Sequence, residues 1–199
     1  MREGPVAYQG APGAFSEDAA LQLCGADTTL RPCRTLEDVF LALVRGEAAA
    51  AVIPVENSIA GDVPGCRALV ARHHLRTTKT LTLPIVHALV ASSAMAVDDV
   101  REVHSHPMAL AQCRRFLAAH PRMLSVPAFD TAGALAELMR QPPGTAAAIA
   151  SRRAAVHLGG VVLQDGIQDR ADNCTEFWLV IPTSLTAAAF AAGDIGSKM

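Results

Sequence analysis

Apolar segments of strand length alternate along the chain with longer segments that have helical apolar spacing, and this alternation predicts an α/β fold. Short uninterrupted apolar runs are typical of buried strands, whereas apolar positions spaced by about one helical turn indicate a helix covered on one side. The predicted strands are residues 6–10, 49–54, 75–83, 85–91, 100–104, 123–126, 146–150, 161–163 and 177–181. The predicted helices are residues 17–24, 36–45, 63–73, 107–119, 131–140 and 151–159.

Polar residues mark the starts of several predicted helices. Thr35 and Asp38 match the capping-box spacing, in which two side chains satisfy each other's backbone N–H groups. Asp130 and Ser151 are residue types that commonly cap helices, and Pro107 stands where proline is favoured, at a first helical position. These signals support the predicted order of elements.

The strand–helix pattern restarts after Pro84, which predicts two lobes that each contain a parallel sheet. We expect residues 1–84 and 177–199 to form the first lobe and residues 85–176 the second. Ligands of open α/β sheets bind beyond the carboxyl ends of the strands. The polar clusters that follow strands are therefore candidate site segments: residues 56–58, 105–107 and 172–175.

Composition and charge favour a small-molecule partner. The 199 residues include 17 Lys and Arg against 19 Asp and Glu, so no basic field attracts nucleic acid or an anionic membrane. We find no leader segment and no apolar run long enough to span a bilayer, and we therefore expect a cytoplasmic protein. The 5 cysteines are widely spaced, which predicts reduced thiols in place of a disulfide framework or a zinc site.

The residues of the polar clusters leave several chemistries open. Asn57 and Ser58 offer uncharged donors and acceptors that could fix ligand oxygens or simply cap a loop. His104 and His106 would share one face of a strand, but no third ligand has suitable spacing, so we expect no metal. The glycines of residues 10–13 could present N–H groups to an anion, although they do not form a dinucleotide fingerprint.

Several separated motifs occur in one order along the chain. They are YQGAPGAFS at residues 8–16, PVENSIAG at 54–61, LPI at 83–85, SHPMALAQC at 105–113, DTA at 130–132 and AIAS at 148–151. Together they resemble the prephenate dehydratase family, and the resemblance covers residues 6–181.

The resemblance implies a cofactor-free enzyme that removes water and carbon dioxide from prephenate to give phenylpyruvate, in phenylalanine biosynthesis. It also implies a homodimer whose chain forms two Rossmann-like lobes with a cleft between them, similar to type II periplasmic binding proteins. The family's principal catalytic threonine corresponds to Thr175. The resemblance implies these substrate-binding residues: Glu56, Asn57, Ser58, Ser105, Gln112, Thr131 and Phe177.

The chain departs from the family pattern at Glu176, which replaces the arginine of a Thr-Arg-Phe motif. An anion beside a substrate with two carboxylates would weaken binding. One interpretation is that Glu176 points away and that Arg152 or Arg170 supplies the cation. The others are a prephenate decarboxylase that does not aromatise its substrate, and a ligand-binding homologue without activity.

Many family members continue into an ACT domain that senses phenylalanine. Here only about 18 residues follow Ile181, and they are mostly small. We therefore expect no ACT domain and no feedback inhibition of that type.

Overall fold

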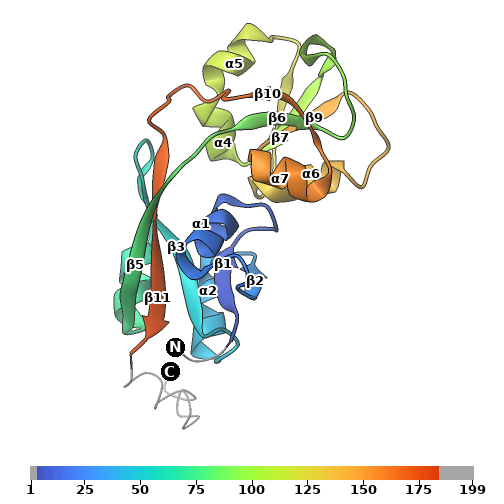
Figure 1. Ribbon diagram of the computed structural model, residues 1–199. Coiled ribbons are helices and arrows are strands. Elements are labelled where there is room, and N and C mark those ends of the chain that lie inside the picture. Colours follow the sequence, from blue (N-terminus) through green and yellow to red (C-terminus); the bar gives the residue numbers. More distant parts are fainter. Residues whose placement is uncertain (1–3, 184–199) are drawn as a thin grey trace, which may run out of the picture. The chain divides into compact units, whose positions relative to one another are not determined.

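The computed structural model describes residues 4–183, which divide into two compact α/β units (Figure 1). Within this range the first unit comprises residues 4–9, 16–83 and 174–183, and the second comprises residues 10–15 and 84–173. The prediction differs at three places, since it put residues 10–15 and 84 in the first lobe and residues 174–176 in the second. None of the described helices is both long and apolar enough to cross a bilayer.

The first unit has one mixed sheet with the strand order β2-β1-β3-β11-β5, and β4 pairs with β3. Strand β1 is parallel to β2 and β3, whereas β11 is antiparallel to β3. The strands are β1 (Val6–Gln9), β2 (Leu30–Cys33), β3 (Ala50–Asn57), β4 (Gly61–Asp62), β5 (Leu75–Pro84) and β11 (Cys174–Pro182). The helices are α1 (Phe15–Cys24), α2 (Leu36–Val44) and α3 (Cys66–Arg72).

The second unit has a five-stranded sheet with the order β10-β6-β9-β7-β8. Strand β7 is parallel to β8 and β9, and β6 is antiparallel to β9 and β10. The strands are β6 (Ala88–Ala91), β7 (Glu102–Ser105), β8 (Leu124–Pro127), β9 (Ala146–Ala150) and β10 (Val161–Asp165). The helices are η1 (Val97–Asp99), α4 (Pro107–Gln112), α5 (Arg114–Ala119), α6 (Thr131–Leu138) and α7 (Arg152–Leu158).

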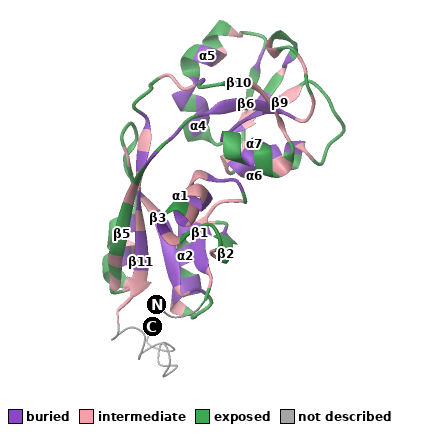
Figure 2. Ribbon diagram, viewed as in Figure 1, coloured by how far each residue is buried: buried purple, intermediate pink, exposed green. Residues whose placement is uncertain are grey.

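Strand β9 shows how the second unit buries both faces of its sheet. Alternate residues of this strand belong to two different apolar clusters: Ala147 and Ile149 to one, Ala148 and Ala150 to the other. All four are fully buried, and Figure 2 shows strand β6 and most of β9 in the purple of buried residues. A strand covered on both faces reads as an unbroken apolar run, which is why the sequence predicted it correctly.

The α/β prediction is confirmed, but the prediction of a parallel sheet in each lobe is right only for β1, β2 and β3 and for β7, β8 and β9. Strands β6 and β11 enter their sheets antiparallel to their neighbours. The pairing direction depends on contacts distant in sequence, and local apolar patterns do not encode it. Strand β2 was not predicted because it contains Pro32, a residue that sheets tolerate mainly on edge strands such as this one.

The predicted helix over residues 107–119 is two helices separated at Cys113. The Gln112 carbonyl accepts a hydrogen bond from the Asp169 N–H at 2.7 Å and so leaves the helical ladder. Cys113 has φ −119° and ψ 27°, outside the helical region, and its N–H bonds to the Leu110 carbonyl in a tighter turn. A contact from a distant segment therefore interrupts a continuous helical pattern.

Candidate active site

The carboxyl end of β3 and the start of β11 carry the first polar cluster that the sequence singled out. The predicted strand ended at residue 54, but β3 continues to Asn57 because β4 and β11 pair with its last residues. Thr175 lies opposite Asn57 and Glu176 opposite Glu56, and the register then shifts so that Phe177 lies opposite Pro54. The shift is a β-bulge, which is a common way to redirect side chains at the end of a strand pair.

The Asn57 carboxamide joins β3, β11 and the following turn. Its Nδ2 donates to the Cys174 carbonyl and to the Thr175 hydroxyl, each at 2.9 Å. Its Oδ1 accepts from the N–H groups of Ile59 at 3.0 Å and Ala60 at 2.9 Å. Because both ends of the carboxamide are occupied, the side chain is held in one orientation.

Ser58 adds a second connection to β11. Its N–H donates to the Cys174 carbonyl at 2.9 Å, and its hydroxyl accepts from the Cys174 N–H at 3.0 Å. The backbone before Thr175 is therefore fixed on both its donor and its acceptor side. The sequence left open whether Asn57 and Ser58 bind a ligand or cap a loop, and the geometry shows that they do at least the second.

Thr175 is buried, with an exposed fraction of 8%. In the part of the chain that the structure describes, its hydroxyl oxygen bonds only to Asn57, from which it accepts. A threonine hydroxyl that accepts a bond still carries one proton to donate. The Asn57 amide therefore orients a buried hydroxyl and leaves its proton available to a ligand.

Glu176 belongs to the opposite face of β11, because successive side chains of a strand point to opposite faces. Its carboxylate accepts from the Trp178 indole N–H at 3.0 Å, and the Arg67 guanidinium lies 5.0 Å from the Trp178 ring centroid. A hydrogen bond from Arg67 to Asp62 raises the pKa of Arg67, and the charges of Glu56 and Glu176 act in the same direction. The carboxylate that replaces the family's arginine thus has the Trp178 indole as its hydrogen-bond partner and lies within the electrostatic influence of Arg67, which itself pairs with Asp62 and Glu56.

The two arginines proposed as substitute cations both have carboxylate partners. Arg152 bonds to Asp165 through two nitrogens, at 3.0 and 2.7 Å, and Arg170 bonds to both oxygens of Asp172. These are exposed pairs in the second unit. The charge of each arginine is therefore already balanced in part by its own carboxylate partner.

The structure gives the burial or the partners of four other predicted binding residues. Ser105 is fully buried, and its hydroxyl donates to the Ile149 carbonyl at 2.7 Å. Phe177 is 2% exposed and belongs to the apolar interior of the first unit, while the Glu56 carboxylate pairs with Arg67 at 3.2 Å. Thr131 is half-buried at the start of α6, directly after the N-cap Asp130.

Gln112 lies in a buried polar cluster of the second unit. The sequence pointed to Gln112 but not to His87. The Gln112 Oε1 atom is 2.9 Å from Nε2 of His87 and accepts from Asn173 Nδ2 at 3.0 Å. Burial lowers the pKa of His87, and the bond to Gln112 acts against this. A polar residue in the otherwise apolar stretch 85–91 was the signal that could have pointed to His87.

The packing around Gly13 accounts for a glycine at this position of the first motif. Gly13 has a φ of 90°, and an added Cβ would lie 2.7 Å from the Ala154 Cα atom on α7. The Ser151 hydroxyl also donates to the Gly13 carbonyl at 2.9 Å. This glycine therefore allows the loop of residues 10–15 to pack against α7.

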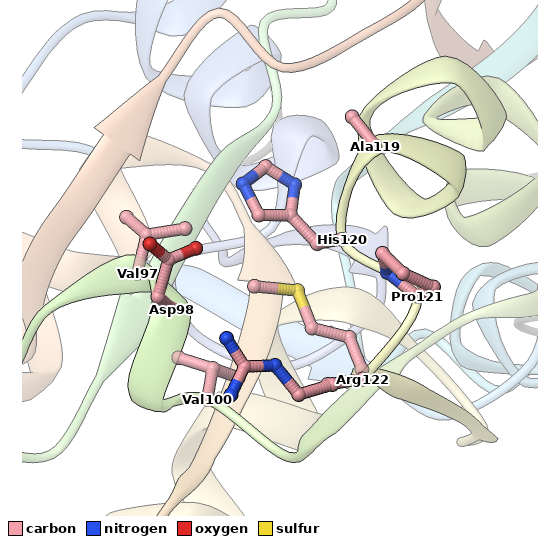
Figure 3. A pocket seen from close by; sticks show the side chains of 8 residues that line it. Val97, Asp98, Val100, Ala119, His120, Pro121 and Arg122 are labelled. Carbon is pink, nitrogen blue, oxygen red and sulfur yellow. The ribbon is translucent and has the colours of Figure 1, made fainter.

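Two cavities of the second unit lie away from the predicted residues. One of about 170 Å³ is lined by Val97, Asp98, Val100, Ala119, His120, Pro121, Arg122 and Met123, and Figure 3 shows His120 facing Val97 and Asp98 across it. The other, of about 290 Å³, lies between β8 and α6 and includes His104 in its lining. No predicted site residue lines either one.

The remaining candidate ligands have local roles. His104 contacts Glu102 at 3.1 Å, and His106 caps α4 by accepting from the Met108 N–H. Over residues 4–183, no group of three or more His, Cys, Asp or Glu side chains could hold a metal ion. The five cysteines are free, and burial raises the pKa of Cys66 to about 11 and that of Cys113 to about 12.

Comparison with known sequences agrees with the motifs. The family model "Prephenate dehydratase" matches residues 6–184. Arogenate dehydratase/prephenate dehydratase 2 of Arabidopsis thaliana is 36% identical over 175 residues, which cover 88% of this chain and 45% of the relative. Arogenate dehydratase 3 of the same plant is 40% identical over 173 residues, which cover 86% of this chain and 41% of the relative. The chain thus spans less than half the length of these relatives.

Solved structures show the same likeness in three dimensions. Prephenate dehydratase from Arthrobacter aurescens, in complex with L-Phe, has a TM-score of 0.82 and 32% identity, covering 90% of this chain and 60% of that chain. A structure described as a novel type of quorum quenching acylase has a TM-score of 0.79 and 31% identity, covering 89% and 64%. The chain belongs to the prephenate dehydratase family.

Proposed function

We propose that the protein is a dehydratase that removes water and carbon dioxide from prephenate. The observation that carries the proposal is the buried Thr175 hydroxyl, which accepts a hydrogen bond from Asn57 and keeps its own proton. Asn57 lies on a motif that resembles the family's, and Thr175 keeps the threonine of the motif that is altered at Glu176. The names of the family model and of the Arthrobacter relative support prephenate as substrate, while the plant relatives direct the alternative toward arogenate.

The reaction needs little from the protein beyond positioning and one proton. The bond from the ring to its carboxylate breaks, and that electron pair enters the ring as carbon dioxide leaves. The ring hydroxyl departs as its carbon–oxygen bond breaks, and one proton converts the leaving oxygen to water. The product gains an aromatic ring, so the sum of these steps is strongly downhill.

The Thr175 hydroxyl is suited to assist the departing oxygen. A free threonine hydroxyl is a weak acid, but the Thr175 hydroxyl is already oriented by Asn57 in a buried position and can donate a hydrogen bond without reorganising. Positioned proton donors typically contribute about 10²- to 10⁴-fold to a rate. In our proposal Thr175 is the catalytic residue, and its proton stabilises the oxygen as it leaves.

The surroundings of each side chain divide the remaining candidates into two groups. Ser58, Gln112 and Thr131 keep the role of substrate-binding residues in the proposal, because uncharged donors suit carboxylate and keto oxygens. Ser105 and Phe177 support the interior of their units, and Glu56 balances the charge of Arg67. Asn57 is the residue that orients Thr175.

The position of Glu176 supports a dehydratase in preference to a decarboxylase. The altered residue lies on the face of β11 opposite Thr175, beside Trp178 and near the charge of Arg67. The loss of the family's arginine therefore leaves the Asn57–Thr175 pair intact.

The deciding experiment incubates the purified protein separately with prephenate and with arogenate. We expect carbon dioxide and phenylpyruvate, followed by its absorbance in alkali, from prephenate. Phenylalanine formed efficiently from arogenate alone would change the substrate but keep the dehydratase. Carbon dioxide released without an aromatic product would establish a decarboxylase, and tight binding of either compound with no product would establish a binding protein; both results would overturn the proposal.

A further inference from the structure

His87 is a buried titratable side chain in the second unit that the proposed chemistry does not use. It is 2% exposed and precedes β6. Its backbone is fixed on both sides, since its N–H donates to Gln168 Oε1 at 3.0 Å and its carbonyl accepts from the Ile167 N–H at 3.0 Å. The Phe15 ring meets the imidazole edge-on, with 5.7 Å between the ring centroids. The ring is therefore held in place by its backbone and by an aromatic neighbour.

The hydrogen bonds of the cluster define the protonation of this ring. Gln112 Oε1 already accepts from Asn173 Nδ2 at 3.0 Å, and an amide oxygen has no proton to give. The His87 Nε2 atom, 2.9 Å from the same oxygen, must therefore carry a proton and donate it. Burial disfavours the charged imidazole, which leaves the neutral form with its lone pair on Nδ1.

The Nδ1 atom agrees with this assignment. It is buried and has no hydrogen-bond partner among the described residues. A protonated Nδ1 there would place an unpaired charge in the interior, which costs more than an unpaired lone pair. Donation from Nε2 to Gln112 is thus the single polar interaction of the ring within the described chain.

We propose that His87 is a positioning residue that fixes the orientation of the Gln112 carboxamide. Two donors, from His87 and Asn173, converge on the Gln112 carbonyl oxygen, and they fix which end of the carboxamide is the oxygen and which is the NH₂ group. This inference rests on the proposed function, in which Gln112 binds a substrate oxygen. Without His87 the carboxamide loses one of the two bonds that distinguish its oxygen from its nitrogen.

Two substitutions of His87 test whether it positions Gln112 or only fills space in the interior. His87→Gln keeps a side-chain N–H donor and removes the titrating ring, whereas His87→Leu removes the donor. We expect His87→Gln to keep KM for prephenate within about threefold of wild type, and His87→Leu to raise KM about tenfold with a smaller change in kcat, as for one lost hydrogen bond. His120→Gln is the matched control, because His120 is a half-buried histidine of the same unit that also packs on an aromatic ring, Phe116.

The protonation state is measured without reference to activity. In protein carrying ¹⁵N-labelled histidine, we expect one signal pair, absent from His87→Gln, that shows a neutral ring protonated on Nε2 at pH 7. A ring protonated on Nδ1, or a charged ring at that pH, would overturn the inference even if the wild type were inactive. In active protein, a His87→Leu variant with the KM of His120→Gln, or a His87→Gln variant as impaired as His87→Leu, would also overturn it. Should His87→Leu not fold, His87→Gln and the labelled signals still decide.

Discussion

The two units each contain a cluster built around a carboxamide, and the clusters use that group in opposite ways. In the first unit, the Asn57 oxygen accepts hydrogen bonds from backbone N–H groups, and its NH₂ group donates one to Thr175. In the second, Gln112 collects two donors, from His87 and Asn173, on its oxygen. Asn57 thereby orients the Thr175 hydroxyl, whereas the Gln112 carboxamide is itself oriented by His87 and Asn173.

Two buried hydroxyls, those of Thr175 and Ser105, differ in whether their proton is already used in a hydrogen bond. The Thr175 hydroxyl keeps a proton that can act on a substrate, while the buried Ser105 hydroxyl of the second unit donates its proton to the Ile149 carbonyl. Two hydroxyls with similar burial thus differ in what remains available after their own bonds are made. Availability, and not residue type, distinguishes the proposed catalytic residue.

After the loss of the Thr175 hydroxyl itself, the largest effect is expected from reversing the donor at Asn57. In Asn57→Asp, a carboxylate oxygen replaces the amide that donates to Thr175, so the hydroxyl turns its proton toward the carboxylate. We expect kcat to fall about 100-fold, as when a preorganised donor is lost. Steady-state kinetics measure this, with the free energy of unfolding determined in parallel. A kcat within threefold of wild type would show that Thr175 does not depend on Asn57.

A smaller effect, on stability alone, is expected at Ser105. Ser105→Ala removes the donor to the buried Ile149 carbonyl and should lower the free energy of unfolding by about 1–3 kcal/mol. Denaturant titration measures the loss, and kcat/KM should stay within threefold. A tenfold loss of kcat/KM in a folded Ser105→Ala protein would return Ser105 to the substrate-binding group.

The buried ring of His87 predicts a pH dependence of stability. Its pKa is lowered in the folded protein, so below the unfolded value of about 6.5 the unfolded chain binds more protons. Stability is therefore full above that pH and declines as the pH falls toward the folded pKa. Burial also lowers the pKa of His73, so the informative quantity is the difference between wild type and His87→Gln. Equal pH dependence in the two proteins would contradict a neutral buried His87.

The smallest effect is expected at Glu176. Glu176→Gln keeps an oxygen for the Trp178 indole and removes a charge near Arg67. Because these groups are partly solvated, the free energy of unfolding should change by less than about 1 kcal/mol. The value of kcat/KM should stay within threefold, since Glu176 and Thr175 lie on opposite faces of β11. A change above tenfold would show that both faces take part in the reaction.

Local signals predicted much of the fold. The capping box of Thr35 and Asp38, the N-caps Asp130 and Ser151, and Pro107 at a first helical position all occur as expected, because each depends on residues within one helical turn. The motif resemblance also brought Asn57 and Thr175 together as candidates, and the structure pairs them directly.

The remaining features depend on contacts between distant segments. The bulge that sets Thr175 opposite Asn57 arises from the pairing of β3 with β11, which lies far along the chain. The break at Cys113 accompanies the bond from the Asp169 N–H, and the hydrogen bonds of the Gln112 oxygen come from His87 and Asn173. A single sequence contains no local pattern for such contacts, and His87 in particular looked like part of an apolar strand.

The central claim is that the Thr175 hydroxyl stabilises the departing oxygen by donating a hydrogen bond to it. Its most direct test is kcat for phenylpyruvate formation in Thr175→Ser and Thr175→Ala, with the Tm of each protein as the control for folding. Serine keeps the hydroxyl, so we predict a kcat within about tenfold of wild type, whereas alanine should lose about 10²- to 10⁴-fold. A folded Thr175→Ala protein that turns over prephenate as fast as Thr175→Ser would contradict the account.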